Sequence, residues 1–274
     1  MFKYLGLILS IFWINISFAD TLSKNKSESQ IETPLECSKD EAIIIKNHDS
    51  LLWFRDSAEM KAIYRQIFAN SIDKIDDMIE SNNLKPKTWG VVMALDGTLL
   101  DDSGFEYKKN HHCLAENITT RTEYQTLIHL DATPGAADFS CQIHDRGGKV
   151  FIVTNRNGAD DNGRKLIDET IANLKQENIC FDSILFANGN GNTNKNPRFN
   201  AITSGDYENM IVTTTQVATP IIAFVGSDIQ DFPNLKQNIS HDLDGDSEYF
   251  DDFGEKYFLL PNPTYGSWQE NTLH

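Results

Sequence analysis

Five short, uninterrupted apolar segments constrain the fold of this chain more than any other feature of its sequence. They span residues 90–95, 149–153, 183–186, 221–225 and 257–260. Continuous apolar runs, unlike alternating ones, are typical of strands buried on both faces of a parallel sheet. The stretch 162–177, between the second and third runs, has helical periodicity, so strands and helices alternate. We therefore predict an α/β fold with a parallel sheet and helices on both of its faces.

Other segments extend this plan. Between residues 56 and 81, apolar residues recur every three to five positions, which predicts an N-terminal helix capped by Asp56 or Ser57. Residues 101–131 have no strand pattern, and we expect them to form an insertion, a small cap beside the carboxyl edge of the sheet. Residues 203–219 are likewise long for a simple connection. The predicted domain covers residues 46–274.

The first 19 residues resemble a secretory signal peptide. Lys3 supplies a positive charge, residues 5–18 are apolar, and the segment ends in the small-x-small pattern at Ala19. The apolar run is short for a membrane span of ~20 residues, so we predict cleavage and no stable membrane span in the mature chain. Residues 20–45 read as a flexible polar leader without a cysteine at the cleavage point for lipid attachment. The mature protein is expected to be soluble in the periplasm or secreted.

Charge and cysteines narrow the possibilities further. Forty acidic against twenty-four basic residues give a net charge of −16, which disfavours a nucleic-acid-binding surface. Any anion site must then be built from local groups. After export, the four cysteines could form two disulfides in three possible pairings, which the sequence leaves open. These cysteines are Cys37, Cys113, Cys141 and Cys180.

Polar residues follow four of the apolar runs, where parallel-sheet proteins place their sites. The first loop, residues 95–101, contains Asp96 and Thr98, and its backbone N–H groups can face an anion. Thr154 and Asn155 leave the second strand and offer a hydroxyl and backbone N–H groups to a phosphoryl oxygen. Further along, a basic pair can neutralise phosphate and an acidic pair can bind a cation. These pairs are Lys195 with Arg198, and Asp228 with Asp231.

In these motifs the sequence resembles the haloacid dehalogenase (HAD) superfamily, and more narrowly the bacterial class C acid phosphatases, which include lipoprotein 5′-nucleotidases. The likeness covers roughly residues 50–270. Besides the loops, it rests on residues 132–136 (ATPGA), 148–156 (GKVFIVTNR), 195–199 (KNPRF) and 260–268 (LPNPTYGSW). It implies a HAD-like Rossmannoid sheet and a phosphomonoester or 5′-nucleotide phosphohydrolase activity.

The resemblance also assigns roles to individual residues. In the family, a first Asp attacks phosphorus, and a second Asp, here Asp96, acts as general acid and base. Mg²⁺ bridges the first carboxylate, the backbone carbonyl of the second Asp and an Asp from the fourth loop, which makes Asp96, Asp228 and Asp231 the candidate metal ligands. The expected phosphate-binding residues are Thr98, Thr154, Asn155, Lys195 and Arg198. The organic group of the substrate is expected near Tyr265 and Trp268, where a nucleobase could stack, although both aromatic residues could simply pack against the last strand.

Two residues depart from the family pattern. Ala94 stands at the position of the nucleophile, and Ser227 stands where the family has an Asp. A methyl group cannot attack phosphorus, and losing a nucleophile costs on the order of 10⁴–10⁶ in kcat in other covalent enzymes. We therefore predict a protein that binds phosphate or a phosphomonoester with weak or no turnover, and with weakened Mg²⁺ binding. The alternatives are an active phosphatase using Asp96 or another acid, and a non-catalytic interaction protein.

Overall fold

The computed structural model describes residues 48–112, 118–159, 163–189 and 193–272, all within one compact unit, residues 33–274. The predicted signal peptide (1–19) and leader (20–45) lie outside the described residues, as do Cys37 and Cys113. No helix in the described ranges has the length and apolar character needed to span a bilayer.

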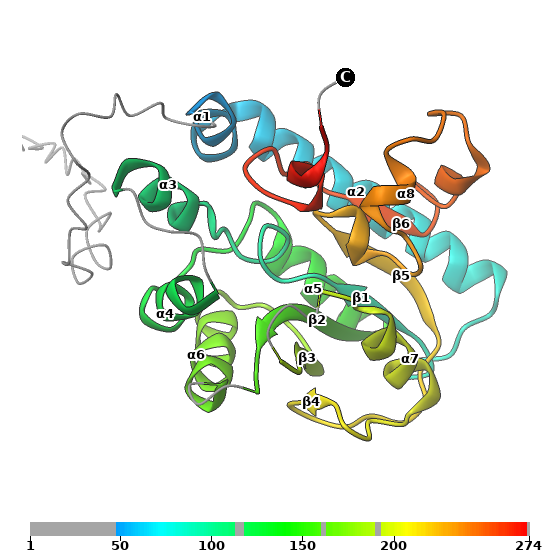
Figure 1. Cartoon of the computed structure of the whole chain (residues 1–274). Helices are drawn as coiled ribbons and strands as arrows, with labels where there is room; N and C mark the ends of the chain where they lie inside the picture. The colour runs from blue at the N-terminus through cyan, green and yellow to red at the C-terminus, as the bar shows by residue number, and fades with distance from the viewer. Residues whose placement is uncertain (1–47, 113–117, 160–162, 190–192, 273–274) are drawn as a thin grey trace, which may run out of the picture. The chain divides into compact units, whose positions relative to one another are not determined.

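The six strands form a single sheet in the order β4-β3-β2-β1-β5-β6 (Figure 1). Five strands are parallel and β4 runs antiparallel to β3. The strands are β1 (Gly90–Met93), β2 (Lys149–Asn157), β3 (Ser183–Ala187), β4 (Ile211–Val212), β5 (Ile221–Gly226) and β6 (Tyr257–Leu259). The predicted α/β fold and all five predicted strands are confirmed. The short edge strand β4, inside the long connection 203–219, has too few residues to show a pattern.

The register of the central strands brings their polar loops to one edge. Met93 at the end of β1 pairs with Ile152 of β2 on one side and with Val225 of β5 on the other. Every residue of β1 and β3 is buried, as the apolar runs predict. Because β1, β2 and β5 are parallel, their carboxyl ends lie at one edge of the sheet, and polar residues near these ends, including Asp96, line the same cavity.

Two helices precede the sheet, where the sequence predicts one. They are α1 (His48–Asp56) and α2 (Ala58–Ser81). Ser57 separates them, and its hydroxyl accepts a hydrogen bond from the Met60 N–H, the N-cap that the sequence allows. Asn82 is the C-cap of α2, so the helix ends at Ser81, where the predicted helical pattern ends. On α2, Tyr64, Phe68 and Ile75 are buried.

Helices cover both faces of the sheet. Helix α2 contacts β5, β6 and α5 (Ala136–Asp145), and the rings of Phe68 and Phe139 lie 4.9 Å apart between the two helices. On the opposite face, α7 (Asn196–Ser204) packs Phe199 and Ile202 against a core that includes Val92. Helix α6 (Gly163–Gln176) contacts β2. The remaining short elements are α8 (Gln237–Ser240) and the 3₁₀ turns η1 (Ile229–Asp231), η2 (Glu248–Phe250) and η3 (Ser267–Glu270).

The insertion between β1 and α5 is helical. It contains α3 (Ser103–His112) and α4 (Ile118–Leu127), and α4 packs against α6. Away from the insertion, Cys141 and Cys180 form a disulfide with their Cα atoms 4.9 Å apart. This bridge joins α5 to the segment before β3. It is one of the disulfides that the sequence allows but does not single out.

Candidate phosphate-binding site

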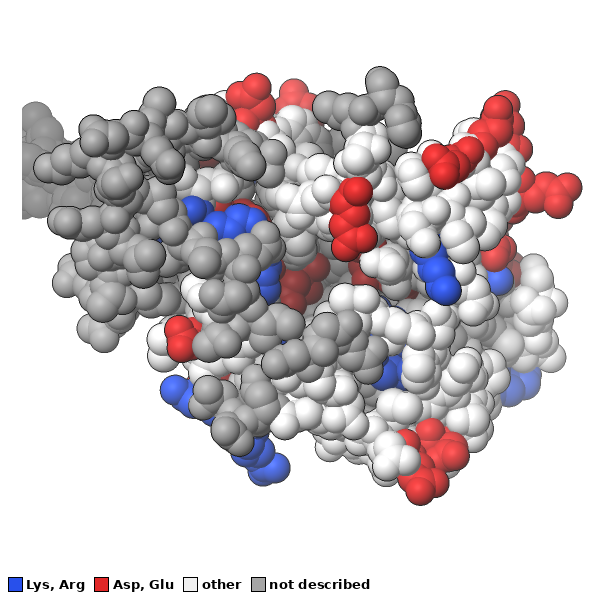
Figure 2. Space-filling model, viewed as in Figure 1, with Lys and Arg blue, Asp and Glu red and all other residues white. Residues whose placement is uncertain are grey.

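A cavity of about 460 Å³ lies at the carboxyl edge of the sheet. The ends of β1, β2 and β5 line its floor, the start of α7 and the segment 262–270 line its sides, and α4 contributes Arg121, Thr122 and Gln125. In Figure 2, acidic side chains are recessed in the hollow near the middle of this face, with basic side chains beside them. The insertion therefore forms part of the wall of the cavity, as predicted for a small cap.

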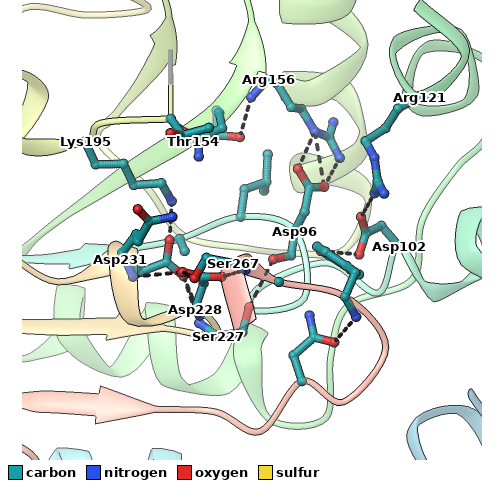
Figure 3. A pocket seen from close by; sticks show the side chains of 18 of the residues that line it. Asp96, Asp102, Arg121, Thr154, Arg156, Lys195, Ser227, Asp228, Asp231 and Ser267 are labelled. Carbon is teal, nitrogen blue, oxygen red and sulfur yellow. Dashed lines mark hydrogen bonds and ion pairs between the residues drawn. The ribbon is translucent and has the colours of Figure 1, made fainter. Parts of the chain in front are cut away.

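Asp96 is held by an arginine from the neighbouring strand. The Asp96 carboxylate accepts hydrogen bonds from Nη2 of Arg156 at 2.6 Å and from Nε at 3.1 Å (Figure 3). Nη1 of Arg156 donates to the hydroxyl of Thr170 on α6 at 2.8 Å, so the guanidinium is fixed on both sides. Arg156 follows Thr154 and Asn155 in the sequence, and it was not among the predicted site residues. Its place next to these two residues was the signal that could have identified it. All three lie in β2, which extends to Asn157, beyond the predicted strand 149–153.

The loop that carries Asp96 is anchored from outside the cavity. The hydroxyl of Tyr64 on α2 donates to the carbonyl of Gly97 at 2.7 Å. Gly97 has φ +71°, and an added Cβ would lie 2.9 Å from the Ser227 hydroxyl. Thr98 is fully buried, and its carbonyl accepts a hydrogen bond from the Thr133 hydroxyl. The structure does not place Thr98 among the residues lining the cavity, unlike the other predicted residue of this loop, Asp96.

Lys195 and Asp231 form a buried ion pair at the side of the cavity. The Lys195 ammonium lies 2.6 Å from Oδ1 of Asp231, and both side chains are less than one-tenth exposed. Oδ2 of Asp231 accepts the N–H groups of Ser227 at 2.9 Å and Asp228 at 3.0 Å. Lys195 and Asp231, both predicted as site residues, line the cavity, and Lys195 is the N-cap residue of α7.

Asp228 faces the C-terminal segment. Its carboxylate accepts hydrogen bonds from the Ser267 N–H at 2.5 Å and the Ser267 hydroxyl at 2.7 Å, and it also caps η1 through the N–H of Gln230. The side chain thus ties the β5 loop to the segment before η3 (Figure 3). Asp228 lines the cavity, but these three donors occupy its carboxylate.

Thr154, Asn155 and the guanidinium of Arg198 lie together on one side of the site. We call it the cationic side because of the charge of Arg198. Thr154 and Asn155 line the cavity. Arg198 lies behind them and donates to the Thr154 carbonyl and, at 2.7 Å, to Oδ1 of Asn155. Burial lowers the pKa of Arg198 to about 10, although the charge of Asp231 opposes this shift. Arg198 is absent from the residues lining the cavity, and it instead holds Thr154 and Asn155 through these hydrogen bonds.

A second acidic centre, which the sequence analysis missed, lies under the insertion. Asp102 is 1% exposed and accepts hydrogen bonds from the Tyr265 hydroxyl at 2.7 Å and from Arg121 at 3.0 Å. Burial and the charge of Asp96 raise the pKa of Asp102 to about 7, whereas Arg121 and Tyr265 oppose the shift. The Arg121 guanidinium also stacks over the Tyr265 ring, 4.9 Å from its centroid. No strand exit marks Asp102 or Arg121 in the sequence.

The two aromatic residues predicted near an organic group behave differently. Tyr265 lines the cavity, and burial raises its pKa well above the ordinary value. Trp268 is 37% exposed and its indole N–H donates to the Asn262 carbonyl at 3.2 Å. Trp268 does not line the cavity, so in this structure only Tyr265 can contact a ligand there.

Ala94 and Ser227 lie at the centre of the floor. Ala94 follows β1 directly and presents a methyl group to the cavity. The hydroxyl of Ser227 lies 3.3 Å from the Asp96 carbonyl and donates a hydrogen bond to it. The Asp96 carbonyl is the oxygen that the family resemblance assigns to Mg²⁺.

These contacts do not fit a Mg²⁺ site. Mg²⁺ requires near-octahedral oxygen ligands and usually one or two free carboxylates. Among the described residues, the Asp96 carbonyl accepts a hydrogen bond from Ser227, the Asp231 carboxylate from Lys195 and two N–H groups, and the Asp228 carboxylate from Ser267 and Gln230. Ala94 offers no ligand atom. The donor set that would hold the ion therefore lacks a carboxylate at position 94, and its remaining carboxylates are already engaged by other donors.

The chain is similar to known acid phosphatases. The family described as HAD superfamily, subfamily IIIB (acid phosphatase), matches residues 34–268. The structure is similar to that of the class C acid phosphatase from Bacillus anthracis, with a TM-score of 0.66 and 22% identity over 83% of this chain and 88% of that one. A second structure of the Bacillus anthracis enzyme, with tungstate bound, gives a TM-score of 0.65 and 22% identity, covering 82% and 87%. The chain belongs to the HAD subfamily IIIB acid phosphatase family, a family that generally uses Mg²⁺.

Proposed function

We propose that this protein binds inorganic phosphate or a small phosphomonoester in the cavity and hydrolyses it weakly or not at all. The observation that carries the proposal is the pairing of residues that can hold a phosphoryl group with a floor that has no carboxylate at the position of the nucleophile. Lys195 and Thr154 line the cavity together with the methyl group of Ala94. The first two can hold phosphoryl oxygens, whereas the third cannot attack phosphorus.

The charges in the cavity favour this assignment over a working phosphatase. Three basic side chains line it, against the five acidic side chains Asp96, Asp102, Asp228, Asp231 and Glu270. Carboxylates at positions 94 and 227, as the family pattern has them, would add two more negative charges close to a bound anion. Their absence lowers the repulsion of a phosphate when no cation is present to compensate. The tungstate complex of the Bacillus anthracis enzyme supports an oxyanion as ligand for this fold.

We further propose that the protein acts after export. The signal-like residues 1–19 support this, and the Cys141–Cys180 disulfide is consistent with an oxidising compartment such as the periplasm or the cell exterior. We propose a phosphomonoester that carries a nucleoside as the ligand, because the aromatic side chain of Tyr265 lines the cavity.

Binding and turnover are measured separately in the test. The mature chain is titrated calorimetrically with inorganic phosphate and with nucleoside monophosphates, and assayed on p-nitrophenyl phosphate with Mg²⁺ and with a chelator. We expect saturable binding that does not need Mg²⁺, and turnover at least about 10⁴-fold below that of an ordinary covalent enzyme. Thermal stabilisation by the same ligands provides a second readout.

Two variants make the result specific. Lys195→Gln removes the cation at the side of the cavity, whereas Lys165→Gln removes an exposed lysine of α6 as a control of equal charge change. Affinity should fall at least tenfold in the first variant and stay unchanged in the second. Robust hydrolysis that Asp96→Asn abolishes would instead establish an active phosphatase. Absence of binding by any of these ligands would favour an interaction protein and overturn the proposal.

A further inference from the structure

A cluster of three potential metal ligands lies outside the cavity. His129 and Asp131 belong to the segment that follows α4, and Glu177 follows the end of α6. Their ligand atoms all lie within 4.8 Å of one another. None of the three lines the cavity, and the phosphate site does not use them.

The chemistry of the cluster fits a zinc-like cation. An imidazole nitrogen with two carboxylates is a ligand set suited to Zn²⁺, which commonly takes three protein ligands and a water. Zn–ligand distances of about 2.0–2.2 Å place tetrahedral ligands about 3.3–3.6 Å apart. Nε2 of His129 and Oε1 of Glu177 are now 2.7 Å apart, and Asp131 is exposed and can turn toward them. His129 and Glu177 are 25% and 21% exposed, so solvent reaches the site.

The backbone around the cluster is already ordered. The side-chain amide of Asn173 on α6 accepts the N–H of Leu130 at 2.9 Å and donates to the Leu130 carbonyl at 2.7 Å. Oε2 of Glu177 accepts the N–H of Ala132 at 2.8 Å, which leaves Oε1 turned toward His129. Leu130 and Ala132 are thus tied to the end of α6, which fixes the backbone of the two ligands that flank Leu130. Outer hydrogen bonds of this kind orient ligands in metal sites.

We propose that His129, Asp131 and Glu177 form a binding site for a divalent transition-metal cation, with Zn²⁺ as the best-fitting ion. The bound ion joins the segment after α4 to the end of α6. Because α4 supplies Arg121, Thr122 and Gln125 to the wall of the cavity, the ion restrains the insertion without touching the ligand. This site does not depend on whether the cavity binds phosphate.

A second histidine–carboxylate pair provides an internal control. Nε2 of His144 lies 2.8 Å from Oδ2 of Asp182, in a contact of nearly the same length as the His129–Glu177 contact. Among the described residues, however, this pair has no third ligand within the same reach. The charge of Lys149 acts on Asp182 and disfavours a cation there. A histidine–carboxylate hydrogen bond alone therefore does not define the site.

The test is a Zn²⁺ titration of the mature chain in competition with a chromogenic chelator, in phosphate-free buffer. We expect the wild type to bind Zn²⁺ with an affinity that falls at least tenfold in His129→Gln and in Asp131→Asn. His144→Gln should bind like the wild type. Because Asp131 is exposed, Asp131→Asn is expected to fold normally, and its melting temperature without Zn²⁺ verifies this.

Thermal denaturation gives an independent readout. Zn²⁺ should raise the melting temperature of the wild type and of His144→Gln, and raise it less in the other two variants. Zn²⁺ affinities of His129→Gln and Asp131→Asn within twofold of the wild type would overturn the proposal, as would a wild type that binds no Zn²⁺. Unchanged phosphate affinity in the same variants would be compatible with it, because the two sites are separate.

Discussion

The two sides of the cavity differ in how many of the site residues expected from the family pattern they retain. On the side formed by β2 and α7, Thr154, Asn155 and Lys195 line the cavity, and Arg198 supports them from behind. On the side formed by β1 and β5, Ala94 and Ser227 offer a methyl and a hydroxyl that is already engaged by the Asp96 carbonyl. The first side keeps the residues that the family resemblance assigns to phosphate, whereas the second side lacks the carboxylates expected at positions 94 and 227. In our proposal, binding and reaction are therefore separable properties of this scaffold.

The largest expected effect comes from adding the two missing carboxylates to the side formed by β1 and β5. Ala94→Asp combined with Ser227→Asp restores a nucleophile and a second carboxylate, and should raise Mg²⁺-dependent hydrolysis of p-nitrophenyl phosphate by at least about 10²-fold, part of the 10⁴–10⁶ that a nucleophile supplies elsewhere. Each single variant should gain far less, because one carboxylate cannot complete the octahedral set. A full gain from Ala94→Asp alone would show that Ser227 does not limit the metal.

A smaller effect, on the unfolding free energy, is expected from a change on the side formed by β2 and α7. Lys195→Met leaves the Asp231 carboxylate buried without its cation, and breaking such a pair costs about 3–5 kcal/mol of unfolding free energy. Adding Asp231→Asn removes the stranded charge and keeps an oxygen for the N–H groups of Ser227 and Asp228, so the double variant should recover much of the loss. Urea unfolding measures both. A cost below about 1 kcal/mol for the single variant would mean that the pair is not desolvated as the structure shows.

The smallest effect concerns the acid beneath the insertion. The folded protein raises the pKa of Asp102 to about 7, so it binds that proton more tightly than the unfolded chain does. The stabilisation from this proton is complete below the ordinary aspartate pKa of about 4 and is lost as the pH rises through about 7. Relative to Asp102→Asn, the unfolding free energy of the wild type should therefore fall by at least about 1 kcal/mol between pH 5 and pH 8. Parallel pH profiles would contradict this assignment.

The sequence predicted the sheet well because burial on both faces leaves an unbroken apolar run. It also placed the Ser57 cap and the end of α2 correctly, since both depend on neighbouring residues. Asp102 and Arg121 escaped prediction because their roles arise from burial under an insertion, which no local pattern records. Helix α1, before Ser57, was not predicted, and the strand β4 was missed because two residues are too few to show a pattern. Trp268 was expected near the ligand and instead lies beside the cavity, bonded to Asn262.

The anchoring of the Asp96 loop has a consequence for how such a site can change over time. Tyr64 holds the Gly97 carbonyl from α2, and Thr133 holds the Thr98 carbonyl from the segment before α5. Neither anchoring side chain lines the cavity, so the curvature of the loop is encoded apart from its reactivity. Substitutions facing the ligand can then accumulate without collapse of the backbone beneath them. A protein lineage could therefore lose catalytic side chains at this site and still keep the backbone shape of the loop that carried them.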